Sequence, residues 1–117
     1  MEWNVIFDPE FRIWFYQQKP EFQDEAFAVI KILEESGPLL GRPRVDTLKG
    51  SSFNNMKELR IQYLGEPWRI LFAFDPKRQA ILLVGGNKTG NNRWYKENIL
   101  IADKRYAEYL ETLEEEN

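Results

Sequence analysis

Three segments in the second half of the chain constrain the fold more than any other feature of the sequence. Each is rich in aliphatic and aromatic residues, and they cover residues 56–63, 68–75 and 80–88. The connectors between them, LGEP and PKRQ, are short enough for β-hairpins and too short for the crossover connections of parallel strands. We therefore expect an antiparallel meander of three strands.

The first third of the chain is predicted to form one strand and two helices. Residues 3–7 alternate weakly between polar and apolar side chains, as in a strand. Asp8 followed by Pro9 is typical of a helix start, and a short helix through Gln18 follows. Pro20 begins a second helix, whose apolar residues recur at spacings of three and four. This apolar stripe consists of Phe22, Ala26, Val29, Ile30 and Leu33.

Two further segments complete the chain. A Gly-Pro pair ends the second helix, and residues 37–55, rich in Gly, Pro, Ser, Asn and basic side chains, are predicted to form a long loop. A last helix is predicted from Asn91 or its neighbour to about Leu113, with residues 113–117 frayed.

These elements predict one α+β domain that spans residues 1–117, in the order β-α-α-β-β-β-α. Its sheet should be small, twisted and mainly antiparallel, with two N-terminal helices packed on one face and a C-terminal helix. No segment reaches the ~20 apolar residues that cross a bilayer, and the N-terminus lacks the pattern of a signal peptide, so we expect a cytoplasmic protein.

Charge is distributed unevenly along the chain. The net charge is −3, yet 13 of the 16 Lys and Arg residues lie between positions 41 and 105. The same stretch holds nearly all the strand signals, so its charges should converge on a surface that could meet phosphate. The alternative is chance clustering on a solvated surface. The chain has no Cys and no His, which removes thiolate nucleophiles, the commonest general base and the commonest transition-metal ligand, so we expect no cofactor and no metal.

Alternation along the strands predicts which side chains share a face. The helices should cover the apolar face and leave the other face open. The open face would carry Glu58, Arg60 and Gln62 from one strand and Arg69, Leu71, Ala73 and Asp75 from the next. Arg60 and Arg69 should lie close together across the hairpin. Two like charges there cost stability, so either an anion is bound between them or each pairs with a carboxylate, Glu58 or Asp75.

The stretch GGNKTGNNRWY, residues 85–95, resembles a phosphate-binding loop at first sight. It lacks the glycine spacing of a nucleotide-binding P-loop, and its strand is predicted to be antiparallel, so a nucleotide cradle is excluded. What remains is a lysine at a strand end and a turn that leads into a helix with Arg93, Trp94 and Tyr95. This pattern is typical of an RNA-backbone contact with aromatic stacking, although Trp94 fits a core position equally well.

Several of these motifs together resemble the RelE/ParE superfamily of bacterial toxins, most closely its HigB-like branch. The similarity lies in LLGRPRVDTLKGS, MKELRI, PWRILFAFD and AILLVGGNKTG, followed by Trp94 and Tyr95. The resemblance implies a β-α-α-β-β-β core with a variable C-terminal helix, and a small antitoxin partner, HigA-like with a helix-turn-helix, that alone contacts DNA. It also implies one of two activities: RelE and HigB members cut mRNA in the ribosomal A site, whereas ParE members poison DNA gyrase. A relative that keeps only antitoxin binding is the third alternative.

The resemblance assigns roles to particular residues. Arg69 matches the arginine that contacts the scissile phosphate, and Arg60 belongs to the matching Leu-Arg pair. The family's basic position falls at Lys88 or Thr89, and its aromatic position falls at Tyr95. Cleavage in this family is metal-independent attack of the 2′-OH on the adjacent phosphate.

That chemistry also needs a proton acceptor. An ordinary lysine is protonated at neutral pH, so Lys57 could act only if Arg60 and Arg69 crowded it. Glu58 is the simpler candidate, and Tyr95 could stack on a base or donate to the leaving oxygen. The residues expected to contact ribosomal RNA are Arg42, Arg44, Lys49, Arg93, Trp94 and Lys96.

Overall fold

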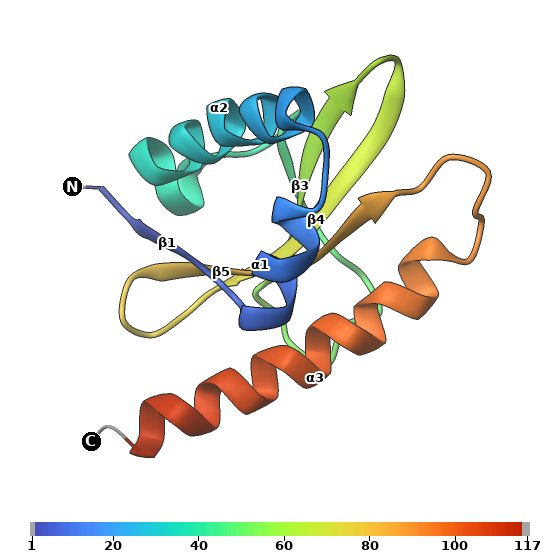
Figure 1. Cartoon of the computed structure of the whole chain (residues 1–117). Coiled ribbons are helices and arrows are strands. Elements are labelled where there is room, and N and C mark those ends of the chain that lie inside the picture. The colour runs from blue at the N-terminus through green and yellow to red at the C-terminus, as the bar shows by residue number, and fades with distance from the viewer. Residues whose placement is uncertain (1, 116–117) are drawn as a thin grey trace.

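A computed structural model describes residues 2–115 of the chain. The predicted α+β fold is confirmed (Figure 1). Its strands are β1 (Asn4–Phe7), β2 (Val45–Thr47), β3 (Met56–Tyr63), β4 (Glu66–Phe74) and β5 (Gln79–Asn87). Its helices are α1 (Pro9–Tyr16), α2 (Pro20–Ser36), the short 3₁₀ helix η1 (Gly37–Leu39) and α3 (Trp94–Glu115).

The five strands form one sheet in the order β1-β5-β4-β3-β2. β3, β4 and β5 are consecutive antiparallel neighbours, so the predicted meander is confirmed. β1 pairs with β5 in parallel, although α1, α2 and strands β2 to β4 separate the two strands in the sequence. The sheet is therefore mainly antiparallel, as expected.

Helices α1 and α2 pack on one face of the sheet (Figure 1). Asp8 caps α1 by accepting hydrogen bonds from the backbone amides of Glu10 and Phe11, and proline occupies the first turn of both helices. The apolar stripe predicted for α2 is mostly buried against the sheet, together with Phe11 and Phe15 of α1.

The other face of the sheet is not open, which corrects our prediction. Helix α3 crosses it and buries a second apolar cluster that includes Leu71 and Ala73, both fully inaccessible. Alternation along a strand predicts which side chains share a face but not what covers that face, so the sequence alone does not reveal that α3 lies over it. The arginine pair lies on this same face, beside the first turn of α3.

The segment predicted as a loop contains η1 and β2. The backbone amide of Leu48 donates a hydrogen bond to the carbonyl of Met56, which extends the pairing of β2 with β3. The loop that follows is attached to α3, because Asp103 accepts hydrogen bonds from Ser51 and Ser52. At the C-terminus, α3 continues through Glu115, two residues beyond the predicted end of the helix, and residues 116–117 of the segment predicted to fray lie outside the described part. No helix within residues 2–115 is long and apolar enough to cross a membrane.

The glycines that open GGNKTG are strand residues that leave room for tryptophan rings. A Cβ at Gly86 would lie 2.7 Å from Nε1 of Trp94, and one at Gly85 would lie 2.6 Å from the ring of Trp14. Both contacts are closer than real Cβ atoms allow. The two tryptophans thus pack directly on the backbone of β5 from opposite faces of the sheet.

Replacing Gly86 with Ala should lower the free energy of unfolding by about 1–3 kcal/mol, because the methyl group must displace the buried ring of Trp94. Urea denaturation monitored by tryptophan fluorescence measures this change. The exposed Gly41, whose Cβ would meet no atom within 4 Å, provides the control substitution to Ala. Equal midpoints for the two variants would contradict the packing of Trp94 on Gly86.

Candidate nucleic-acid interface

Arg60 of β3 and Arg69 of β4 lie directly opposite each other in the register of the sheet, so their predicted proximity is confirmed. Two adjacent like charges are destabilising unless an anion compensates them. The structure places a carboxylate of the chain itself, that of Glu58, beside both guanidinium groups.

Glu58 lies at the centre of this cluster and is only 4% exposed. Its Oε2 accepts hydrogen bonds from Nε and Nη2 of Arg60 at 3.1 and 3.0 Å. Its Oε1 accepts a hydrogen bond of 2.5 Å from the hydroxyl of Tyr95 and lies 3.4 Å from Nε of Arg69. Both carboxylate oxygens are therefore engaged inside the protein. This geometry suits a residue that positions the arginines and Tyr95, and it counts against Glu58 as the group that takes a proton from substrate.

A second carboxylate, which our reading of the sequence missed, extends the network outward. Oδ2 of Asp46 in β2 lies 3.1 Å from Nη2 of Arg60 and 2.9 Å from Nη2 of Arg42. The hydrogen bond from Arg42 holds the pKa of Asp46 below its ordinary value, and the same bond raises the pKa of Arg42. The sequence feature that could have identified this carboxylate is the position of Asp46, an acidic residue two positions after Arg44 in an otherwise basic loop. Asp75 does not join the arginines; it accepts hydrogen bonds within the β4–β5 turn.

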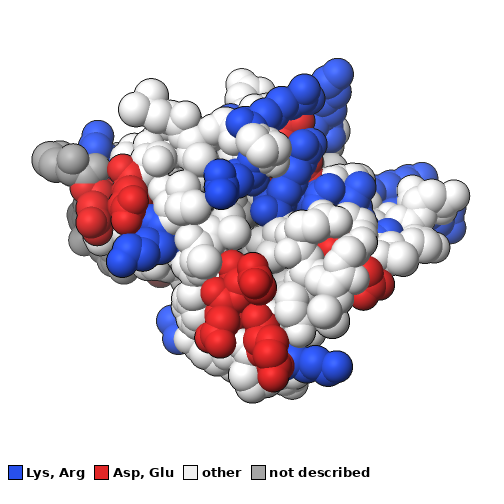
Figure 2. All heavy atoms as spheres, turned by 90° about the horizontal axis from the view of Figure 1, so that it is seen from above, with Lys and Arg blue, Asp and Glu red and all other residues white. Residues whose placement is uncertain are grey.

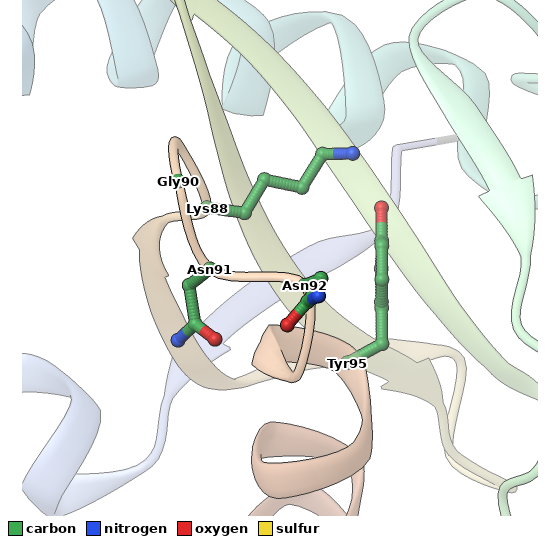
Figure 3. Close-up of a pocket in the computed structure, with 5 residues that line it drawn as sticks. All are labelled: Lys88, Gly90, Asn91, Asn92 and Tyr95. Carbon is green, nitrogen blue, oxygen red and sulfur yellow. The ribbon is translucent and has the colours of Figure 1, made fainter.

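A hollow of about 500 Å³ adjoins the cluster where β5 passes into α3. Its walls come from Lys88, the turn Gly90–Asn92 and Tyr95, all drawn in Figure 3. Lys88 extends across the hollow toward the hydroxyl end of Tyr95, and its Nζ lies 5.1 Å from the ring centroid, within range of a cation–π contact. The arrangement offers a ring face and a positive charge to the same ligand.

A second hollow of about 450 Å³ contains both arginines of the pair. It is lined by Val29, Pro43, Arg44, Arg60, Gln62 and Arg69. Three guanidinium groups thus line one concave surface, and guanidinium is a group that binds phosphate with parallel hydrogen bonds. Figure 2 shows Lys and Arg side chains gathered along one side of the face seen from above, while Asp and Glu side chains gather elsewhere on it.

Burial raises the pKa of Tyr95, and the Glu58 carboxylate that accepts the hydrogen bond of its hydroxyl raises this pKa further, although Arg69 opposes the effect. The phenol is thus held in its neutral form. Because the raised pKa belongs to the folded state, the stability contributed by the neutral phenol is complete below about pH 10 and is lost as the pH rises further.

We expect the ¹³Cζ resonance of Tyr95 in tyrosine-labelled protein to titrate at a higher pH than free tyrosine. Replacing Glu58 with Gln should lower this pKa, since it removes the negative charge next to the hydroxyl. The Tyr95→Phe variant assigns the resonance. Titration of Tyr95 at or below the pH of free tyrosine would contradict the buried hydrogen bond.

The structure does not bring all the predicted residues together. Lys57 lies on the opposite face of β3 and donates to Thr47 at 2.8 Å, so the arginine pair does not crowd it. Lys49 follows β2 at the end that pairs with Lys57, away from Arg60. Trp94 is 5% exposed and belongs to the apolar cluster under α3, so its ring is not available to stack on a base and the core alternative holds.

The remaining predicted contacts are exposed. Arg42 and Arg44 precede β2 beside Arg60, whose backbone amide donates to the carbonyl of Arg44 at 2.7 Å. Arg93 and Lys96 flank the start of α3 next to the first hollow. Within residues 2–115 no three carboxylates are grouped so that they could hold a metal ion.

Residues 13–107 match the family described as Phage derived protein Gp49-like (DUF891). The chain is 50% identical over 107 residues to the putative toxin HigB3 of Mycobacterium tuberculosis, covering 91% of this chain and 92% of HigB3. It is also 50% identical over 104 residues to the putative toxin HigB2 of the same organism, covering 87% of this chain but only 52% of HigB2. The chain thus spans about half the length of HigB2.

Two solved structures share the fold. The toxin RelE of Escherichia coli, a mutant in the free state, superposes with a TM-score of 0.59 at 13% identity, covering 90% of this chain and 98% of RelE. The archaeal RelE–RelB complex from Pyrococcus horikoshii gives a TM-score of 0.54 at 18% identity, covering 77% of this chain and 99% of the matched chain. The sequence matches show that this chain belongs to the Gp49-like family, together with the putative HigB toxins, and it shares the fold of RelE.

Proposed function

We propose that this chain is the toxin of a type II toxin–antitoxin pair and that it cuts mRNA on the ribosome. The observation that carries the proposal is the pair Arg60–Arg69, held side by side by Glu58 and adjoining Lys88 and Tyr95. A gyrase-binding toxin would have no need of cations arranged around an anion-sized hollow. The names of the HigB relatives and the shared RelE fold support the same class of protein.

In the proposed reaction the ribose 2′-oxygen forms a bond to the adjacent phosphorus, and the bond from phosphorus to the 5′-oxygen breaks. Arg69 and Arg60 bind the phosphate oxygens and stabilise the charge that develops on them, a role that suits guanidinium because it stays charged and binds with parallel hydrogen bonds. Lys88 protonates the departing 5′-oxygen. The proton of the 2′-OH passes to water, because the carboxylate of Glu58 is enclosed.

Tyr95 contributes its ring rather than its proton. Its hydroxyl donates to Glu58, which fixes the ring beside the hollow, and a nucleobase can stack on the ring face. Arg42 and Arg44, with Arg93 and Lys96 beside the other hollow, bind the backbone of mRNA and ribosomal RNA. No metal ion or cofactor takes part in this scheme.

The proposed partner of the toxin is a cognate antitoxin of the HigA type that carries a helix-turn-helix, so the complex contacts DNA only through the antitoxin. A RelE–RelB complex among the structures that share the fold supports partnership with an antitoxin. The toxin acts in the cytoplasm, where its ribosomal target lies.

Tightly induced expression in bacteria, followed by mapping of transcript 5′ ends, tests the proposal. We expect growth arrest and new ends inside translated regions, at a fixed position in the codon, which disappear when translation initiation on a reporter transcript is blocked. Growth arrest with intact transcripts would contradict the nuclease and favour a toxin that acts on DNA gyrase. Normal growth of cells that produce the chain would indicate a relative that keeps only antitoxin binding.

A further inference from the structure

The last residue of β5 and the turn that leads to α3 contain three asparagines in six residues, at positions 87, 91 and 92. Two of them have structural tasks. Oδ1 of Asn87 accepts from the backbone amide of Thr89 at 3.0 Å, and Oδ1 of Asn91 accepts from that of Arg93 at 3.0 Å. These two side chains therefore set the shape of the turn.

Asn92 differs from both. It is exposed, and among the residues that the structure describes its side-chain amide makes no hydrogen bond. It nevertheless lines the hollow between the turn and Tyr95. In Figure 3 its amide lies between Asn91 and the ring of Tyr95, whereas the amide of Asn91 points away from the ring. The polar group of Asn92 is thus free for a ligand that enters the hollow.

The walls of the hollow match the parts of a nucleotide. The ring of Tyr95 provides a flat apolar face, and the ammonium of Lys88 lies above it for a phosphate. Gly90, at φ +69°, makes the turn without a side chain, and a Cβ there would meet no atom within 4 Å, so the mouth of the hollow stays open. A primary amide carries one donor group and one acceptor, which is the combination that distinguishes base edges.

We infer that Asn92 reads the nucleobase that stacks on Tyr95 and thereby sets the base preference of the toxin at one codon position. The inference rests on the proposed function, since it assigns a specificity-determining residue to the same site. Asn92 lies outside the set of groups that contact the scissile phosphate. Its replacement should therefore change which codons are cut.

The test maps cut sites produced by the wild-type chain and by Asn92→Ala and Asn92→Asp. A good amide–base pair discriminates against the wrong base by about fivefold or more, so Asn92→Ala should lower the enrichment of the preferred base by about that factor. Asn92→Asp, which can only accept, should favour a different base. Asn54→Ala alters an exposed asparagine in the loop before β3 and should cut like the wild type. An unchanged base preference in both Asn92 variants, or a wild-type chain that cuts without any preference, would overturn the inference while leaving the nuclease in place.

A binding measurement separates this inference from the proposed function. The probes are short 2′-O-methyl oligoribonucleotides, and each is a homopolymer of one of the four bases. Their methylated 2′-oxygen cannot attack the phosphate. Fluorescence anisotropy with the purified chain should give unequal dissociation constants for the different bases, and Asn92→Ala should make them nearly equal. Equal binding of all the oligonucleotides by the wild type would refute base reading by Asn92, whether or not transcripts are cut in cells.

Discussion

Replacing Arg69 with Ala should abolish growth arrest and reduce transcript cutting by about a hundredfold or more, the loss that follows when a preorganised group for transition-state charge is removed. Arg69 is the most enclosed cation of the cluster: its side chain is 12% exposed, and its Nη1 donates to the carbonyl of Trp68 at 3.0 Å. A cation fixed in this way does not have to reorganise when charge develops on the phosphate.

The fold should survive this substitution, because Glu58 keeps its hydrogen bonds from Arg60 and Tyr95. Circular dichroism and co-purification with the cognate antitoxin check this point. Lys31→Ala removes an equal charge from the exposed face of α2 and is the matched control. Persistent toxicity of Arg69→Ala, or equal loss of toxicity in Lys31→Ala, would remove Arg69 from the proposed mechanism.

Glu58→Ala should be the most destabilising single substitution at the site. Removing one member of a buried ion pair costs about 3–5 kcal/mol, because the remaining charges lose their compensation. Here two guanidinium groups and one hydroxyl lose their shared partner. Urea denaturation at neutral pH measures the change, with Glu35→Ala on the exposed face of α2 as the control. A free energy of unfolding within about 0.5 kcal/mol of the wild type would show that Glu58 does not organise the cluster.

Glu58→Gln separates a positioning role from a proton-accepting role, and it keeps the prediction testable if the alanine variant does not fold. The amide oxygen can still accept from Tyr95, but it no longer neutralises the arginines. A positioning residue predicts partial losses of both stability and cutting. Nearly complete loss of cutting at unchanged stability would instead restore Glu58 as the base.

The sequence predicted the meander and the arginine pair because both follow from short-range rules. Short hairpin connectors fix which strands are neighbours, and alternation with matching register then places Arg60 opposite Arg69. Strand β2 escaped prediction because its three residues lie within a run of glycine, proline and basic side chains. This segment forms a strand because it pairs with β3, and not because its own residues favour a strand.

The environment of the site residues depended on contacts that no local pattern contains. Glu58 is enclosed because Tyr95, 37 positions further along the chain, donates to it from α3. Trp94 and Tyr95 are adjacent aromatic residues, and the sequence could not decide between a core and a surface role for Trp94. The first turn of α3 resolves this by directing Trp94 onto Gly86 and Tyr95 toward the hollow.

The separation of charge over the surface also governs how the molecule approaches its target. The chain measures 43 × 32 × 27 Å, whereas electrostatic fields in physiological salt decay over about 8 Å. A polyanion therefore senses one side of the protein at a time, and the overall negative charge is largely screened from it. An encounter that begins on the acidic surface is repelled, while one that begins at Arg42 and Arg44 is retained beside the arginine pair. Orientation is thus selected before any specific contact forms, and under the proposed function this selection would allow a protein of net charge −3 to associate with RNA.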